Sequence, residues 1–419
     1  MSYLADEKKL LNFYISHLKN DVLPFWLNKM DGENGGVFSC INNMGDEILS
    51  TDKYTWSQGR IVWIYSKLAT MDIFSDEEKE VLLGYAKSTA YFLMKNVVLE
   101  NGNCSFILTK EGIPKPEIHG GRCDTNITAD QFVILGLSKY GAVSGDMAAL
   151  NFAKDLYKRV LERTESSGKR EFRSAPMMML NVTSELALAM KELSDSSFEE
   201  TDKWADAYMY DVINNFVGED YLIHERNRVN GPNDKSVMIE RYINPGHTIE
   251  DMWFVMHQAA TKGNIEVIRK AVKVLKAAFE KGWDKEWGGI LLFADEEGGK
   301  PRGSIKGMEK DSQVQKLLND WSNKVWWSHS ETLYTTLLSY ILTGDEEAAQ
   351  LFNTVHDYVF KTFPNPNKEI GEWIQIRDRM GNPEDKFVAL PVKDPFHIMR
   401  NMALIIELLQ GKFTMADKV

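Results

Sequence analysis

The sequence predicts an all-α protein, an (α/α)6 barrel of helical hairpins with short β-hairpins in its loops. Two observations lead to this prediction. Apolar residues recur with the period of an amphipathic helix in about twelve segments along the chain. Two distant parts of the chain also share one sequence pattern, which indicates a repeated structural unit. About twelve helices arranged as repeated hairpins fit a closed ring of hairpins.

The helical segments cover most of the chain, and the connections between them are alternately short and long. Ser75, followed by Glu78, has the signature of a capping box at a helix start. No linker rich in proline and serine divides the chain, so we expect one catalytic domain over residues 1–419. The expected helices span residues 4–29, 54–71, 76–98, 127–143, 147–164, 176–194, 198–216, 248–260, 264–281, 326–343, 346–362 and 396–410.

Short runs with β character lie in some of the connections. Residues 36–41, 104–108 and 289–293 each follow a helix and a turn that contains glycine. We expect them to form small hairpins on the helical frame.

The shared pattern has two parts in each copy. Residues 31–37 resemble residues 284–290, and residues 53–60 resemble residues 324–331. In both copies a Gly-Gly turn precedes a helix that starts with Lys-x-x-Trp-Ser. If the copies are equivalent, two side chains of opposite charge occupy matching positions at one mouth of the barrel, Arg60 and Glu331.

Composition excludes several classes of function. The net charge of −12 and the absence of a basic cluster argue against nucleic acid and against an anionic membrane surface. Three cysteines without CxxC spacing argue against a disulfide framework and against a zinc site. The N-terminus lacks the apolar region of a signal peptide, and no apolar run is long enough to span a membrane. We therefore expect a cytoplasmic protein.

The chain also lacks the common cofactor and nucleophile motifs. It contains no GxGxxG, P-loop, HExxH or GxSxG pattern in the required context. We expect no cofactor and no metal.

Two histidines share a sequence context. His247 and His397 each begin a helical pattern just after a proline, Pro245 and Pro395. The positive end of the helix dipole disfavours the imidazolium form, and a general base must be neutral. The pair therefore fits acid–base chemistry, although capping and packing are the other uses of a histidine at a helix start. His17 and His356 lie in outer helices and are expected at the surface.

Aromatic and charged residues near the repeated helix starts suit a sugar site. Trp326 and Trp327 can stack on the C–H faces of a sugar, or they can form a layer of the core. Arg60 lies in a strongly apolar run, where its charge requires either an ion-pair partner or a bound anion.

Six ordered motifs carry a family resemblance. Residues 53–60 are similar to K-Y-x-W-x-Q-G-R, residues 175–181 to P-M-M-x-L-N, and residues 244–250 to H-P-G-H-x-I-E. Three later segments are similar to K-x-W-W-x-H-S-E, G-E-W and F-H-V-P-R, namely residues 324–331, 371–373 and 396–400. The sequence resembles the N-acylglucosamine 2-epimerase superfamily along nearly its whole length.

This resemblance implies the (α/α)6 barrel and either epimerisation at C2 of a sugar or aldose–ketose isomerisation. It implies catalytic roles for His247 and His397, supported by Arg60 and Glu331. The expected partner is a small monosaccharide, and a homodimer is compatible with the family. The side chains expected to bind the substrate are Tyr54, Asn181, Glu250, Trp326, Trp327 and His329.

Departures from the family pattern leave alternatives open. Asn244 replaces the first histidine of H-P-G-H, and residues 388–395 contain no glycine where N-acylglucosamine epimerases have a Gly- and Lys-rich segment. N-acylglucosamine and N-acylmannosamine are the leading substrates, with unmodified glucose and mannose as the alternative. A glycoside hydrolase is a further alternative and would need paired acids from among Asp124, Asp130 and Glu250. A binding protein without activity is the last.

Overall fold

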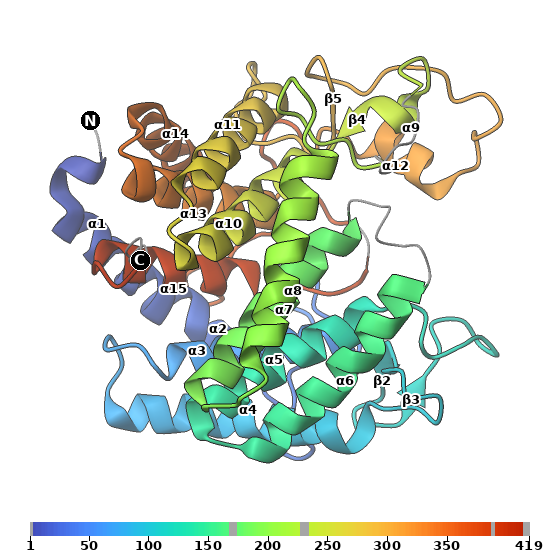
Figure 1. The fold of residues 1–419 in the computed structure, drawn as a ribbon, viewed down its shortest axis with the longest axis vertical. Helices are drawn as coiled ribbons and strands as arrows, with labels where there is room; N and C mark the ends of the chain where they lie inside the picture. Colours follow the sequence, from blue (N-terminus) through green and yellow to red (C-terminus); the bar gives the residue numbers. More distant parts are fainter. Residues whose placement is uncertain (1–2, 167–173, 227–233, 387–389, 414–419) are drawn as a thin grey trace.

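An inner ring of six helices forms the centre of the computed structural model, which describes residues 3–166, 174–226, 234–386 and 390–413. Each inner helix packs against the next, and the last packs back against the first, so the ring is closed (Figure 1). The inner helices are α3 (Thr55–Leu68), α5 (Thr128–Ser144), α7 (Ser174–Glu192), α10 (Pro245–Thr261), α13 (Trp326–Thr343) and α15 (His397–Leu409).

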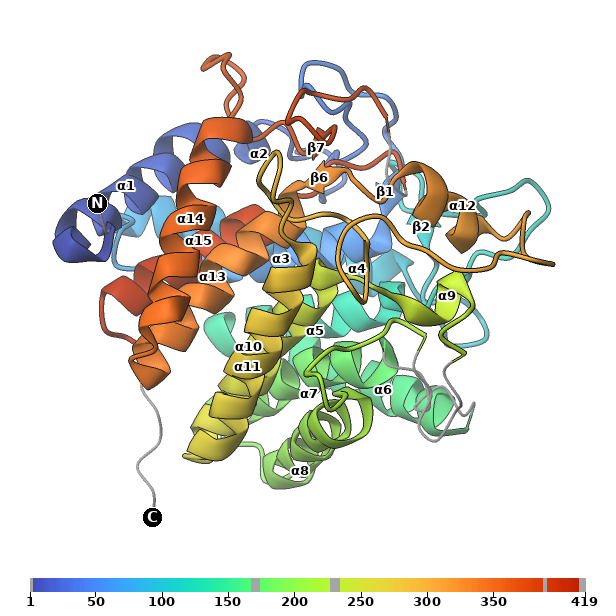
Figure 2. The same cartoon turned by 90° about the horizontal axis from the view of Figure 1, so that it is seen from above.

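An outer layer of helices covers this ring (Figure 2). Each outer helix packs against one or two inner helices, and this alternation of inner and outer helices confirms the predicted (α/α)6 fold class. The outer helices are α1 (Glu7–Ser16), α4 (Asp76–Asn96), α6 (Met147–Ser166), α8 (Phe198–Asp211), α11 (Ile265–Gly282) and α14 (Glu346–Thr362). Ser75 and Glu78 form the predicted capping box at the start of α4.

The N-terminal helix differs from the continuous helix predicted over residues 4–29. A 3-10 turn at Tyr3–Asp6 leads into α1, a π-helical segment follows at His17–Val22, and α2 covers Leu23–Leu27. Pro24 has no backbone N–H and cannot complete the α-helical ladder, so the helix shifts its hydrogen-bonding register just before it.

Short strands fasten the starts of three inner helices. β1 (Lys53–Tyr54) pairs with β2 (Ile107–Leu108), which also pairs with β3 (Pro114–Lys115), and all these pairs are antiparallel. β4 (Tyr242–Ile243) pairs with β5 (Ala294–Asp295), and β6 (Lys324–Val325) pairs with β7 (Ile376–Arg377). β1 lies directly before α3, and β6 lies directly before α13. One residue separates β4 from α10. Two further short helices, α9 (Met238–Arg241) and α12 (Ser312–Asn319), pack together in a projection beside the barrel (Figure 1).

In both copies of the repeated sequence unit a buried lysine binds the aspartate and one carbonyl of the Gly-Gly turn, that of the first glycine in one copy and of the second in the other. Lys53 donates from Nζ to Asp31 Oδ2 at 2.7 Å and to the Gly35 carbonyl at 2.6 Å. In the second copy, Lys324 donates to Asp284 at 3.0 Å and to the Gly289 carbonyl at 3.3 Å. All four charged side chains are buried. The lysine therefore joins each Gly-Gly turn to the helix that follows it, which is a detail that the predicted repeat did not include.

A third copy of this unit is present that the sequence pattern did not reveal. Lys393 forms an ion pair with Glu372, with Nζ 3.0 Å from Oε2, and donates a hydrogen bond to the Trp373 carbonyl at 2.7 Å. Glu372 adopts the positive φ of 60° that glycine adopts in the other copies. The copy was hidden because a glutamate replaces the second glycine and supplies the acid.

Inner helices α3 and α5 cross at unusually close range. A Cβ atom added at Gly59 would lie 2.2 Å from the Phe132 carbonyl oxygen, and one added at Gly136 would lie 2.3 Å from the Gly59 carbonyl oxygen. Each glycine thus allows the backbone of the other helix to approach, which sets the spacing of the ring near Arg60.

The prediction that His17 and His356 lie at the surface is wrong, because the first outer helix packs on the last one. His356 lies among Tyr3, Phe13 and Phe360, and His17 accepts a hydrogen bond from Trp373 Nε1 at 2.8 Å. Both rings are buried.

Buried histidines predict how stability depends on pH. Burial lowers the pKa of His356 to about 4, and of His257 and His329 to about 3. The unfolded chain, with a histidine pKa of about 6.5, then binds more protons than the folded chain. Stability should therefore be full above about pH 6.5 and fall as the pH drops toward 4. Urea unfolding at several pH values measures this, and a His356→Leu variant with the same pH slope as the wild type would contradict it.

Candidate active site

The N-terminal parts of four inner helices meet at one mouth of the barrel. Both predicted histidines stand at capped helix starts there. The Asn244 side chain accepts a hydrogen bond from the His247 N–H at 3.1 Å, and Asp394 accepts one from the His397 N–H at 3.1 Å. Asn244 and Asp394 each lie three residues before the histidine, so the matching sequence contexts correspond to matching local structure.

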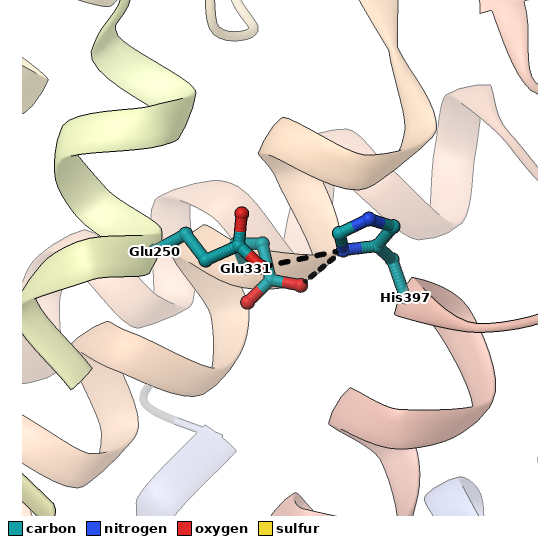
Figure 3. Close-up of side chains that lie close together, drawn as sticks. All are labelled: Glu250, Glu331 and His397. Carbon is teal, nitrogen blue, oxygen red and sulfur yellow. Dashed lines mark hydrogen bonds and ion pairs between the residues drawn. The ribbon is translucent and has the colours of Figure 1, made fainter. Parts of the chain in front are cut away.

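His397 forms a close pair with Glu331. Its Nδ1 atom lies 2.6 Å from Glu331 Oε1, and the other ring nitrogen points away from the carboxylate (Figure 3). An ionised carboxylate only accepts hydrogen bonds, so Nδ1 carries a proton and Nε2 of the neutral ring keeps a free lone pair. Nε2 is therefore the atom of His397 that can take a proton from a ligand.

The Glu331 carboxylate is held ionised by its neighbours. Burial raises the pKa of Glu331, but Arg400, His397 and Asn401 more than offset this and hold it well below its usual range. Arg400 donates to Oε1 at 2.6 Å and Asn401 at 2.7 Å, while Trp253 Nε1 donates to Oε2 at 2.7 Å. This network fixes the orientation of His397.

Glu250 completes the cluster drawn in Figure 3. Its Oε1 accepts a hydrogen bond from Arg400 at 2.6 Å and lies 3.7 Å from His397 Nδ1. The donor atoms of Glu250, Glu331 and His397 are close enough together to hold a metal ion. Arg400 already donates to both carboxylates, so its guanidinium supplies the positive charge that this pair of acids requires.

His247 has a carboxylate partner of its own. Its Nδ1 atom lies 3.1 Å from Glu225 Oε2, which again leaves Nε2 with the free lone pair of the neutral ring. The Trp327 ring lies beside both histidines, with centroid distances of 5.0 Å to His247 and 6.1 Å to His397. The two histidine–carboxylate pairs thus share one aromatic wall.

Arg60 is held by Asp394. Its Nη1 atom donates to Asp394 Oδ1 at 3.0 Å, and the guanidinium lies over the rings of Trp56 and Phe132. Asp394 Oδ2 also accepts a hydrogen bond from Trp326 Nε1 at 3.0 Å. Burial raises the pKa of Asp394, but Arg60, His397 and Trp326 more than offset this and hold it below its usual value.

Comparison with known proteins identifies the group to which this site belongs. The sequence profile of N-acylglucosamine 2-epimerase (GlcNAc 2-epimerase) matches residues 36–400. The chain belongs to the N-acylglucosamine 2-epimerase family. It is 30% identical to N-acylglucosamine 2-epimerase of Bos taurus over 93% of this chain and 89% of the relative. It is 22% identical to cellobiose 2-epimerase of Dictyoglomus turgidum over 94% of this chain and 97% of the relative.

A solved structure has the same fold. The structure of cellobiose 2-epimerase from Bacillus thermoamylovorans aligns with a TM-score of 0.73 at 18% identity, over 96% of this chain and all of the other. Family membership and these relatives make the protein a sugar 2-epimerase, an isomerase that acts on carbohydrate.

The epimerase brings most of the predicted residues to one place. Trp327 lies beside both His247 and His397. Arg400 joins Glu250 to Glu331, which contacts His397. Asp394 joins Arg60 to Trp326 and to the His397 N–H. Tyr54 occupies the N-cap position of α3 and packs on Trp56, whose ring lies against the Arg60 guanidinium. Tyr54 therefore reaches Arg60 only through Trp56. Burial raises the pKa of Tyr54 to about 12.

Asn181 faces a second space behind the mouth. This cavity of about 610 Å³ is also lined by Trp253, Phe396 and Arg400, and neither His247 nor His397 is among its lining residues.

His329 has a structural role in place of the predicted contact with substrate. Its Nε2 accepts the Ile290 N–H at 2.8 Å, and its Nδ1 lies 2.7 Å from the Val325 carbonyl. Neither nitrogen is left for a sugar hydroxyl. Gln58 occupies the same place in the first repeat, where its Oε1 accepts the Val37 N–H at 2.8 Å.

This equivalence predicts the result of a substitution. His329→Gln should keep kcat and KM of the epimerase close to the wild-type values, because glutamine already performs this task in the other copy. Steady-state kinetics and thermal unfolding measure it. A large fall in kcat with an unchanged melting temperature would show that His329 takes part in the reaction.

Three residues of the epimerase site were not predicted from the sequence: Glu225, Asp394 as a partner of Arg60, and Arg400 as the link between two acids. Glu225 stands in a connection without helical periodicity, so no sequence pattern marks it. The acids that a hydrolase would need do not meet. Asp124 pairs with Arg122, Asp130 pairs with Arg163, and Glu250 belongs to the cluster.

Among the described residues, no helix combines the length and the apolar character needed to cross a membrane.

Proposed function

We propose that this epimerase interconverts N-acylglucosamine and N-acylmannosamine by moving the proton at C2 between two histidines, without a cofactor. The relative named for N-acylglucosamine is 30% identical, whereas the relative named for cellobiose is 22% identical. The observation that carries the proposal is the presence of two histidines, each with a carboxylate at Nδ1, beside one indole ring.

The reaction uses the acidity of the hydrogen at C2, which lies next to the aldehyde of the open-chain sugar. One histidine Nε2 removes this proton, and the electrons of the C–H bond form an enolate that keeps the 2-acylamino group on C2. With an unmodified aldose the same step would give an enediolate. The other histidine, protonated at the start, returns a proton to C2 from the opposite face, which inverts the configuration. Two bases on opposite sides of a planar intermediate achieve this inversion.

The remaining residues support these two steps. Arg60 stabilises the negative charge that develops on the carbonyl oxygen, and Asp394 holds Arg60 in place. Glu331 orients His397 and stabilises its protonated form. Trp326 and Trp327 pack on the sugar, and Glu250 binds its polar groups. Tyr54 supports Trp56, and Asn181 lines the neighbouring cavity.

The same proposal includes three expectations from the sequence. The chain works as one catalytic domain, it is located in the cytoplasm, and it forms a homodimer. Analytical ultracentrifugation of the purified protein tests the dimer, and a single mass equal to one chain would contradict it.

Proton NMR in D2O tests the proposed reaction. The protein is incubated separately with N-acetylmannosamine, mannose, glucose and cellobiose. Deuterium at C2 together with the C2 epimer of N-acetylmannosamine is the expected result. A ketose product would assign an isomerase, and turnover of mannose, glucose or cellobiose alone would overturn the N-acyl assignment.

A further inference from the structure

We propose that His247 exchanges its proton with solvent while the intermediate is bound, whereas His397 exchanges only between turnovers and returns a substrate-derived proton unchanged, and that Glu225 is the residue that positions His247. The inference rests on the proposed two-histidine reaction and adds an asymmetry to it. It predicts that the hydrogen at C2 exchanges with water in one epimer of the substrate and not in the other.

The two histidines differ strongly in their surroundings. The His247 side chain is 41% exposed, whereas the His397 side chain is 8% exposed. His397 lies between the rings of Trp327 and Phe396, with Glu331 and Arg400 at its Nδ1 edge. Among the described residues, His247 contacts Trp327 on one face and Glu225 at Nδ1. Water can therefore reach His247 far more easily than His397.

Glu225 gives the exposed histidine a fixed orientation. An exposed imidazole would otherwise rotate and change tautomer, and either nitrogen could then face the sugar. The Glu225 side chain is only 12% exposed and accepts from His247 Nδ1, so it holds Nε2 toward the mouth as Glu331 does for His397. Unlike Glu331, it comes from a connecting segment between α8 and α9, at the rim of the barrel.

The origin of the hydrogen that is returned to C2 then differs between the two epimers. In one epimer the C2–H bond breaks toward His247, the proton goes to its Nε2, and the bonding electrons enter the 2-acylamino enolate. If His397 then donates its proton to the other face, the other epimer forms. If His247 returns a proton first, the original epimer is regenerated, but the returned hydrogen comes from solvent. In the other epimer the C2 proton goes to His397. If His397 returns it before the reaction is complete, the original hydrogen is restored at C2.

Isotope exchange at low conversion tests this asymmetry. The full-length protein in D2O is given N-acetylmannosamine and N-acetylglucosamine separately, and deuterium at C2 is measured in the product and in the recovered substrate. Both products should carry deuterium, but only one recovered substrate should. Equal labelling of both recovered substrates, or of neither, would overturn the inference and leave the epimerase function intact. If no epimer forms from either sugar, the proposed function itself fails.

Variants of the two histidines assign the exchange to a residue. His397→Asn should lose epimerisation but keep deuterium exchange into one epimer, because His247 still removes and returns a proton. His247→Asn should lose both epimerisation and this exchange. The opposite pattern, with exchange kept in His247→Asn and lost in His397→Asn, would overturn the proposal.

Variants of Glu225 test the positioning role. Glu225→Gln should reduce exchange into that epimer by about tenfold or more, since a neutral amide oxygen replaces the carboxylate that stabilises the protonated ring. Glu225→Asp, which keeps the charge, should restore part of it. Glu219→Gln changes an exposed acid in the same connection and should leave the rate unaltered. A Glu225→Gln variant with wild-type exchange would exclude the positioning role.

Discussion

Glu331→Gln should lower kcat of the epimerase by about three to four orders of magnitude while the protein still folds. Loss of the carboxylate that fixes the tautomer of a catalytic histidine has an effect of about this size. Glu331 also accepts hydrogen bonds from Arg400, Asn401 and Trp253. The variant therefore disturbs the hydrogen-bond network that orients His397. Steady-state kinetics with the sugar identified by NMR measure the effect, and circular dichroism checks the fold.

A matched variant separates this catalytic effect from the loss of a buried ion pair. Glu407 lies on the same helix as His397 and pairs with Lys67 at 2.6 Å, away from the mouth. Glu407→Gln should lower stability, as Glu331→Gln does, but should keep kcat near the wild-type value. If both variants lose activity equally, the effect of Glu331 is structural and its catalytic role is contradicted.

Gly59→Ala should destabilise the barrel severely, with a loss of roughly 3 kcal/mol or more in the free energy of unfolding. The added Cβ would meet the Phe132 carbonyl at 2.2 Å, and backbone cannot move aside as a flexible side chain can. The helices α3 and α5 would have to separate, and this would also displace Arg60, the residue after Gly59. Urea unfolding measures the loss.

Gly84→Ala is the matched control on an outer helix. Nothing lies within 4 Å of a Cβ added at Gly84 on α4, so alanine should stabilise that helix by about 0.4–1 kcal/mol. A Gly59→Ala protein that is as stable as the wild type would show that the close helix crossing is not needed for the barrel.

The sequence predicted those parts of the epimerase that leave a local signal. Helical periodicity identified the hairpins, and the paired Asp-to-Gly-Gly turns placed Arg60 and Glu331 at equivalent positions. A proline followed by a helix start marked His247 and His397, and each proved to lie behind an Asn or Asp cap. These signals lie within a few residues of the features that they predict.

The residues that were missed depend on contacts between distant segments. Glu225 meets His247 across 22 residues of chain, and Arg400 meets Glu250 across 150. No spacing in the sequence encodes such a contact. His329 was misassigned for the opposite reason, because its motif suggested chemistry whereas its counterpart Gln58 shows an architectural role.

The three lysine-anchored turns have a consequence for how such a barrel can change its chemistry over evolution. In each copy the residue seven positions after the buried lysine belongs to the charge network, and these residues are Arg60, Glu331 and Arg400. The lysine fixes the conformation of the turn and the helix start, whereas the residue seven positions later determines only the charge at the mouth of the barrel. Mutation can therefore reverse a charge at the mouth without rebuilding the frame. For protein engineering, these three positions are the ones at which a new substrate charge should be accommodated first.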